Sequence, residues 1–213
     1  GTSDPRIKDL AGNALAANFT WSFTTSDPPA PPPIPPVAGP GGPILVISSS
    51  LNPFSIFPVE ILKAEGWNEY KAMDITQVNV TEINNYDVVI LGQMNLTASQ
   101  VTMLTNWTVA GGTLITFKPD QQLSSLLGIT STGTALAEGY LLVNTATGPG
   151  IGIVGETIQY HGTADRYTVN AGTNIIATLF SNATTATTNP AITSKDVGAN
   201  GGQAIAFTFD LAK

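Results

Sequence analysis

A proline-rich segment constrains the fold of this 213-residue chain more than any other feature. Nine of the 18 residues from Ser26 to Pro43 are proline. Because proline fixes φ and lacks a donor N–H, the segment favours extended polyproline II over a helix or a central strand. At about 3.1 Å per residue, it can hold two modules tens of ångströms apart. We interpret it as a spacer; the alternative is a proline-rich ligand for a partner, but no basic flank marks a docking site.

The spacer separates two parts of unequal length. Residues 1–25 are too few to bury a core, whereas residues 44–213 have the size of an ordinary single domain. The first part ends in an alternating pattern typical of a half-buried strand, with Phe19, Trp21 and Phe23 on one face. Its sequence KDLAGNALAANFTWSFTT resembles the C-terminal end of bacterial Ig-like domains of the S-layer type. This resemblance implies an Ig-like strand remnant over 1–25 and neighbouring modules in a longer polypeptide.

Composition excludes several kinds of site. The chain has no cysteine, so a disulfide, a zinc–thiolate centre and a cysteine nucleophile are impossible. The only histidine is His161, and 8 Lys+Arg against 15 Asp+Glu leave a net charge of −7. An acidic chain of this kind is poorly suited to bind nucleic acid, and no apolar run approaches the roughly 20 residues of a membrane span. We predict no metal, no nucleic-acid partner and no membrane span.

One cofactor motif occurs in the wrong context. The residues Gly150–Gly155 fit G-x-G-x-x-G. The dinucleotide fingerprint needs a strand before it and a helix after it, whose N-terminus holds the pyrophosphate. Here Pro149 precedes the motif and a segment with strand character, 157–160, follows it. We favour a glycine-rich hairpin and predict no cofactor.

Residues 44–127 alternate apolar strands with helical segments. Strands are expected over 44–48, 70–80, 86–92 and 113–117. Helices are expected from Asn52 to about residue 65, where Pro58 marks a kink or the true start, from the capping box at Thr97 to about 110, and near 121–127. This rhythm is typical of a parallel three-layer α/β sheet. Beyond Gly128 only strands are expected, in an antiparallel extension or second small sheet: 140–143, 156–160, 167–169, 174–180, 191–195 and 203–209.

A family resemblance covers about residues 43–129. The stretches PILVISSSLNPFSIFPVEILKAEGWNEY and YDVVILGQMNLTASQVTMLTNWTVAGGTLITFKPDQQLSSLLGI resemble class I glutamine amidotransferase-like domains, and more closely the C-terminal domain of the N,N-dimethylformamidase large subunit. The resemblance implies a flavodoxin-like three-layer sandwich with a mostly parallel sheet and a β-rich C-terminal extension. That family keeps a cysteine nucleophile in a strand-to-helix elbow, which corresponds here to Phe117–Asp120, with Lys118 nearest the nucleophile position. Without cysteine, its glutamine hydrolysis is excluded.

A ligand cleft is expected at the carboxyl ends of the parallel strands, where open α/β sheets bind their ligands. Within it, Lys118 and Asp120 either activate a nucleophile or bind a carbonyl, or they contact each other and cap the helix that follows, with Asp120 near its N-terminus. We favour the capping interpretation. The residues expected to line the cleft are Ser48, Ser49, Asn52, Gln93, Lys118 and Asp120.

The segment around His161 is a separate candidate. Asp165 either orients His161 as a general base or forms a structural ion pair with Arg166 at a turn, and we favour the structural ion pair. The candidates for a catalytic role are therefore Lys118, Asp120 and His161.

These observations favour a non-catalytic module of a large secreted or cell-surface bacterial protein, with a structural, adhesive or carbohydrate-contacting role. Its expected location is extracellular or at the cell surface. The alternative is an enzyme or enzyme-associated domain that acts on an amide or a glycan through the cleft. A third possibility is self-assembly, in which the strand 18–25 adds to the sheet edge of another subunit.

Overall fold

The computed structural model describes residues 8, 10–14, 22–23, 39, 41–146 and 148–211. The chain divides into two units, residues 1–34 and 35–213, which are described separately. In the first unit, Lys8 and Ala14 form an isolated antiparallel bridge across a turn that contains Gly12, whose φ is +84°. The strand expected over 18–25 and the spacer expected over 26–43 lie mostly outside the described residues.

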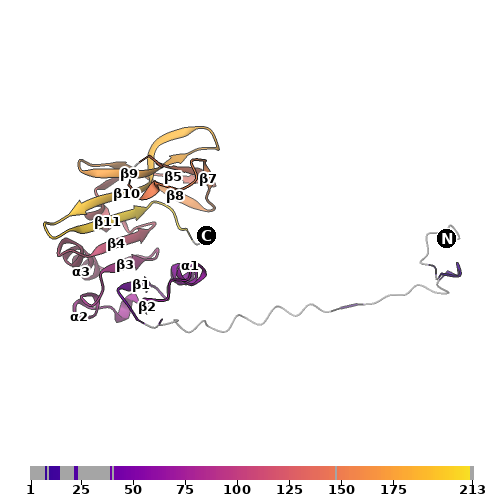
Figure 1. Ribbon diagram of the computed structural model, residues 1–213, viewed down its shortest axis with the longest axis horizontal. Helices are drawn as coiled ribbons and strands as arrows, with labels where there is room; N and C mark the ends of the chain where they lie inside the picture. The colour runs from indigo at the N-terminus through magenta and orange to yellow at the C-terminus, as the bar shows by residue number, and fades with distance from the viewer. Residues whose placement is uncertain are drawn as a thin grey trace. The chain divides into compact units, whose positions relative to one another are not determined.

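The second unit is built on one mixed sheet of nine strands in the order β2-β1-β3-β4-β11-β10-β9-β6-β7. From β2 to β11 the neighbouring strands pair in parallel, and from β11 to β7 they pair antiparallel. Figure 1 shows this sheet as a ladder that climbs from β2 through β4 and β11 to β9. The strands are β1 (Ile44–Ser48), β2 (Tyr70–Asp74), β3 (Val88–Leu91), β4 (Thr113–Phe117), β6 (Tyr140–Val143), β7 (Ile158–Gln159), β9 (Thr173–Phe180), β10 (Ala186–Val197) and β11 (Gly202–Phe207).

Helices cover both faces of the parallel strands. All five residues of β1 are buried, and its side chains alternate between two cores. Leu45 and Ile47 pack with Leu104 of α3 on one face, whereas Val46 packs with Val59 of α1 on the other. Accordingly, α1 lies on one side of the sheet and α2 and α3 lie on the opposite side (Figure 1). The helices are α1 (Pro58–Ala64), α2 (Val80–Ile83), α3 (Ala98–Val109) and α4 (Ser124–Leu127), with 3-10 turns η1 (Pro53–Ile56), η2 (Ile75–Gln77), η3 (Gln121–Leu123) and η4 (Gly148–Gly150).

Side-chain caps decide where these helices begin. Thr97 and Gln100 form the predicted capping box of α3. Asn52 caps only η1, and α1 begins at Pro58, so the first expected helix is really a 3-10 turn followed by a short helix. The strand expected over 70–80 ends at Asp74, because the Asp74 carboxylate accepts the N–H of Thr76 and starts η2.

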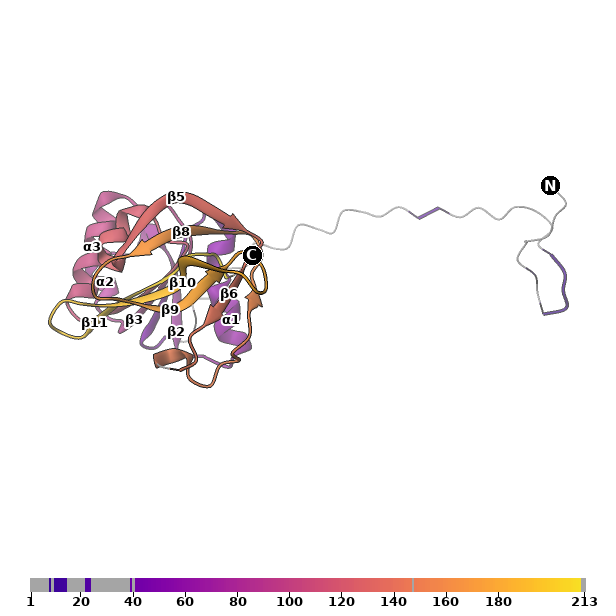
Figure 2. The ribbon, with the colours of Figure 1, turned by 90° about the horizontal axis from the view of Figure 1, so that it is seen from above.

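A second, two-stranded sheet covers the antiparallel strands. It pairs β5 (Ile129–Ala137) with β8 (Thr163–Val169), and Figure 2 shows the two side by side next to β10. Ala164 of β8 packs with Leu179 of β9 and Ala191 of β10. Asn189 Nδ2 also donates to the carbonyl of Tyr167 at 2.9 Å, where β10 carries a register shift next to its proline.

The expected fold class is therefore wrong. The domain is β-rich with a mixed nine-stranded sheet, not a flavodoxin-like three-layer sandwich with a mostly parallel sheet. The reason lies in residues beyond Gly128, whose alternating apolar pattern extends the same sheet with antiparallel strands. Strands β5 and β8, rather than helices, then cover that extension.

Candidate functional site

A cleft of about 570 Å³ opens at the carboxyl ends of β1, β3 and β4. Five of the six residues expected from the sequence line it: Ser49, Asn52, Gln93, Lys118 and Asp120. The sixth, Ser48, does not line it, and its hydroxyl donates to the carbonyl of Met73 on the neighbouring strand β2 at 3.4 Å. Six further residues complete the lining: Leu51, Met94, Asn95, Pro119, Gln121 and Asp165.

Asn52 ties two of the cleft loops together. Its Nδ2 donates to the carbonyl of Gln93 at 2.8 Å, and its Oδ1 accepts the N–H of Phe54. Next to it, a Cβ added to Gly92 would lie 2.5 Å from the carbonyl oxygen of Ser55, so only glycine lets β3 approach η1 this closely. The side chain of Asn52 therefore positions the cleft walls.

Asp120 has a capping role. Its Oδ1 accepts the N–H of Gln122 at 2.9 Å and starts η3, and its Oδ2 accepts the N–H of Leu96 at 2.8 Å. Both carboxylate oxygens are thus engaged by the backbone. The cap on the following helix agrees with the interpretation favoured from the sequence, but the contact between Lys118 and Asp120 that belonged to it is wrong, because Lys118 pairs with Asp165.

Lys118 instead faces Asp165 across the cleft. Its Nζ lies 3.8 Å from Asp165 Oδ1, and the two side chains are 19% and 32% exposed. Lys118 also has a φ of 41°, in the left-handed region that favours glycine. Burial raises the pKa of the Asp165 carboxyl, although the positive charge of Lys118 opposes this shift.

His161 belongs to a different hollow. This hollow of about 230 Å³ is lined by His161 together with Tyr160, Phe209 and other residues of the antiparallel half. His161 Nδ1 lies 3.0 Å from Glu138 Oε2, and both side chains are largely exposed, at 71% and 57%. The hydrogen bond with His161 and the N–H of Gly162 lower the pKa of Glu138.

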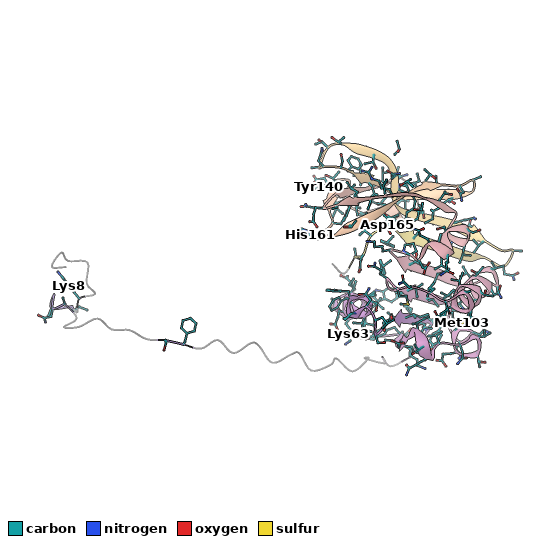
Figure 3. The ribbon with its side chains drawn as sticks, turned by 180° about the vertical axis from the view of Figure 1, so that it is seen from behind. Lys8, Lys63, Met103, Tyr140, His161 and Asp165 are labelled. Atoms are coloured by element: carbon teal, nitrogen blue, oxygen red, sulfur yellow. The ribbon has the colours of Figure 1, made fainter. Side chains whose placement is uncertain are left out.

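The structure therefore does not bring the three catalytic candidates into one cavity. Lys118 and Asp120 line the cleft, and His161 does not. The carboxylate of Asp165 faces Lys118 rather than His161 or Arg166. The ion pair expected at a turn is therefore wrong, because Asp165 and Arg166 are consecutive residues within the strand β8. Figure 3 shows Asp165 nearer the middle of the domain and His161 at its edge.

Asp165 is the charged cleft residue that the sequence analysis did not place in the cleft. The strand was expected to begin at Tyr167, but β8 begins at Thr163 and carries Asp165 to the cleft. The sequence signal for an earlier start of the strand was the position of Asp165 between two apolar residues, Ala164 and Tyr167. Both of these are fully buried in the structure.

No group of three or more histidine, aspartate or glutamate side chains in the described residues is placed to hold a metal ion. Among the same residues, no helix is long and apolar enough to cross a membrane.

Comparison with known proteins adds fold likeness alone. No family model and no curated protein sequence matches the chain. Among solved structures, it is similar to Gan42B, a GH42 beta-galactosidase (TM-score 0.59, 10% identity, 79% of this chain and 27% of that chain). It is also similar to the exo-beta-1,4-mannosidase Op5Man5 from Opitutaceae bacterium strain TAV5 (0.56, 15%, 81% and 32%). A third neighbour is the mmIFT52 N-terminal domain (0.54, 12%, 78% and 85%).

These neighbours correct the family resemblance. They are glycosidases and an IFT52 domain, and they indicate neither a class I glutamine amidotransferase, nor an N,N-dimethylformamidase subunit, nor an Ig-like fold. The chain spans about a quarter of the beta-galactosidase and about a third of the mannosidase. At 10–15% identity the likeness establishes a shared fold and nothing of their chemistry.

Proposed function

We propose that residues 35–213 form a non-catalytic, carbohydrate-contacting module whose ligand occupies the cleft. The observation that carries this proposal is the chemistry of the cleft lining, in which five of the eleven residues have a neutral hydroxyl or amide side chain. Amide side chains both donate and accept hydrogen bonds, as sugar hydroxyls require. The neutral polar residues of the lining are Ser49, Asn52, Gln93, Asn95 and Gln121.

The state of the charged groups supports a binding role over catalysis. A glycosidase needs two carboxyl groups that flank the scissile bond and are free to act as acid and as base or nucleophile. Asp120 has both oxygens engaged by backbone N–H groups, and Asp165 faces Lys118. His161, the remaining candidate base, lines the other hollow.

A modular, secreted or cell-surface protein is the context we propose. The proline-rich segment before residue 44 and the low charge content of 11% support this context. Two of the neighbours are glycosidases of which this chain matches about a quarter to a third, which supports a place beside other domains.

Calorimetric titration of the whole chain with β-galacto- and β-1,4-manno-oligosaccharides tests the proposal. We expect saturable binding that Asn95→Ala and Gln121→Ala weaken. Asn200→Ala is a matched control, since Asn200 is exposed in the turn between β10 and β11 and does not line the cleft. Absence of binding at millimolar sugar would contradict the proposal. Release of shorter sugars during the titration, or hydrolysis of an amide substrate, would favour the enzyme alternative instead.

We keep self-assembly through residues 18–25 as a second proposal, supported by the alternation of Phe19, Trp21 and Phe23. Light scattering of chains with and without residues 1–25 tests it. A monomer in both cases would refute it.

A further inference from the structure

The Lys118 ammonium and the Asp165 carboxylate, which face each other in the cleft, lie too far apart to form a hydrogen bond. The distance of 3.8 Å between Lys118 Nζ and Asp165 Oδ1 exceeds the roughly 2.7–2.9 Å of a charge-assisted hydrogen bond. Within the described part of the chain, neither side chain has another hydrogen-bond partner. An ammonium group offers three donors and a carboxylate about four acceptor sites. These two groups therefore face the cleft with donors and acceptors still open.

The other charged groups around the parallel strands differ. Asp120 has both oxygens bonded to backbone N–H groups. Lys71 and Glu82 lie 2.7 Å apart and are hydrogen-bonded to each other. Among the ion pairs between described residues, Lys118 and Asp165 have the longest spacing, 3.8 Å against 2.7 Å for Lys71–Glu82 and 3.0 Å for Glu138–His161.

The backbone holds the two residues at this spacing. The N–H of Lys118 donates to the carbonyl of Phe207 at 2.8 Å, and the N–H of Asp165 donates to the carbonyl of Thr208 at 2.9 Å. Adjacent carbonyls of one segment therefore anchor both residues. Lys118 also keeps a left-handed φ of 41° that costs a non-glycine residue free energy, as strained residues at functional sites often do.

We infer that Lys118 and Asp165 together anchor a vicinal diol of the bound sugar. One hydroxyl oxygen accepts a hydrogen bond from the Lys118 ammonium, while the neighbouring hydroxyl donates to the Asp165 carboxylate. This inference rests on the proposed carbohydrate-contacting function. Asp165 is then a specificity-determining residue of the cleft.

The charges of the cleft disfavour anionic ligands. Its charged lining residues are one lysine and two aspartates, Lys118, Asp120 and Asp165, so a phosphate or carboxylate ligand would meet a net negative charge. A neutral hydroxyl pair suits both partners because each hydroxyl donates one hydrogen bond and accepts others.

The test uses the whole chain, with methyl β-galactopyranoside and methyl β-mannopyranoside as probes. Their 2-, 3- and 4-deoxy analogues remove one hydroxyl at a time. Binding is followed by titration with ¹H–¹⁵N NMR spectra, which also report whether each variant is folded. We expect Asp165→Asn and Lys118→Met each to weaken binding about 10- to 100-fold, as for a lost hydrogen bond to a charged group. Removal of either hydroxyl of one adjacent pair should weaken wild-type binding similarly.

Matched controls separate this effect from general loss of charge. Lys63→Met in α1 and Asp87→Asn before β3 change exposed residues that do not line the cleft, and should leave affinity unchanged. Lys118→Arg keeps the charge and should restore most of the binding that Lys118→Met loses. If Lys118→Met fails to fold, Asp165→Asn and the deoxy sugars still test the inference.

The outcomes separate the inference from the function on which it rests. If the wild type binds neither sugar, the proposed function fails and the inference fails with it. If the wild type binds and the Lys118 and Asp165 variants bind equally well, the inference alone is wrong. Tighter binding of the methyl β-glycoside of galacturonic acid, which carries a free carboxylate, than of methyl β-galactopyranoside would also overturn it, because an anion would then be preferred.

Discussion

The two halves of the nine-stranded sheet are covered in different ways. The parallel strands lie between helices on both faces, and the larger core there has 21 buried residues. The antiparallel strands are covered by the β5–β8 pair, over a core of eight buried residues. The cleft lies where the halves meet, with Lys118 at the end of β4 and Asp165 on β8. The larger core supports the strand that precedes Lys118, and the smaller half contributes the second charged group.

Truncation of one core leucine in each half should show the largest effect. Leu104 and Leu179 are both fully buried, in the larger and the smaller core. Leucine-to-alanine changes in cores cost about 2–5 kcal/mol, less where the surroundings can collapse. We expect Leu104→Ala in the upper part of this range and Leu179→Ala in the lower part, measured by urea unfolding. Equal or reversed losses would contradict the difference in core support.

The parts of this fold that sequence reasoning predicts are local. The apolar run of β1 and the capping box at Thr97 depend on neighbouring residues, and both occur where expected. The strand β5 was missed because six of its nine residues are exposed and its apolar residues do not alternate with polar ones. The fold class was wrong because the pairing of β11 with both β4 and β10 is a long-range choice.

The same division holds for the candidate site. The capping role of Asp120 depends on residues just after it, and the sequence indicated it. The place of Asp165 depends on a hydrogen bond from its N–H to the carbonyl of Thr208, which no local pattern encodes. Its meeting with Lys118 thus required the structure.

Two buried tyrosines, one in each core, should respond with opposite signs to removal of their hydroxyl. Burial raises the pKa of Tyr167 and of Tyr160 to about 12 in each case. Within the described residues, Tyr167 OH is buried without a hydrogen-bond partner, whereas Tyr160 OH donates to the carbonyl of Leu136 at 2.9 Å. We expect Tyr167→Phe to raise, and Tyr160→Phe to lower, the free energy of unfolding by about 1 kcal/mol. Destabilisation by both changes would show that Tyr167 OH has a partner.

Lys118→Gly should stabilise the fold while it removes the cleft cation. A non-glycine residue in the left-handed region costs roughly 1–2 kcal/mol, which glycine avoids. Glycine, however, loses about 0.5–1 kcal/mol more backbone entropy on folding, and this loss offsets part of the gain. We therefore expect a net gain of about 0.5–1 kcal/mol, measured by thermal unfolding. Lys63→Gly is the control, because Lys63 lies in α1 and glycine there costs about 1 kcal/mol. A loss for Lys118→Gly would mean that the packing of the lysine stem outweighs the strain.

Asp165→Asn should change stability least, by less than about 1 kcal/mol, as for partly exposed ion pairs. Because burial raises the pKa of Asp165 above 3.8, the fold favours its protonated form. That stabilisation is fully present below the unfolded pKa and is lost as pH rises through the folded pKa. Asp165→Asn should therefore be as stable as the wild type or slightly more stable at pH 7, and this advantage should shrink below pH 3.8.

Glu138→Gln in the antiparallel half gives the opposite sign, because the pKa of Glu138 is lowered by its hydrogen bonds to His161 and Gly162. Its stabilisation is present above the unfolded pKa of 4.5 and is lost as pH falls through the folded pKa, so Glu138→Gln should destabilise the fold at pH 7. Unfolding of both variants at several pH values measures the two signs. If Asp165→Asn destabilised the fold at pH 7 as Glu138→Gln does, the ion pair with Lys118 would be a structural contact. A carboxylate that costs stability at neutral pH and weakens sugar binding when removed is instead one held in place for its ligand.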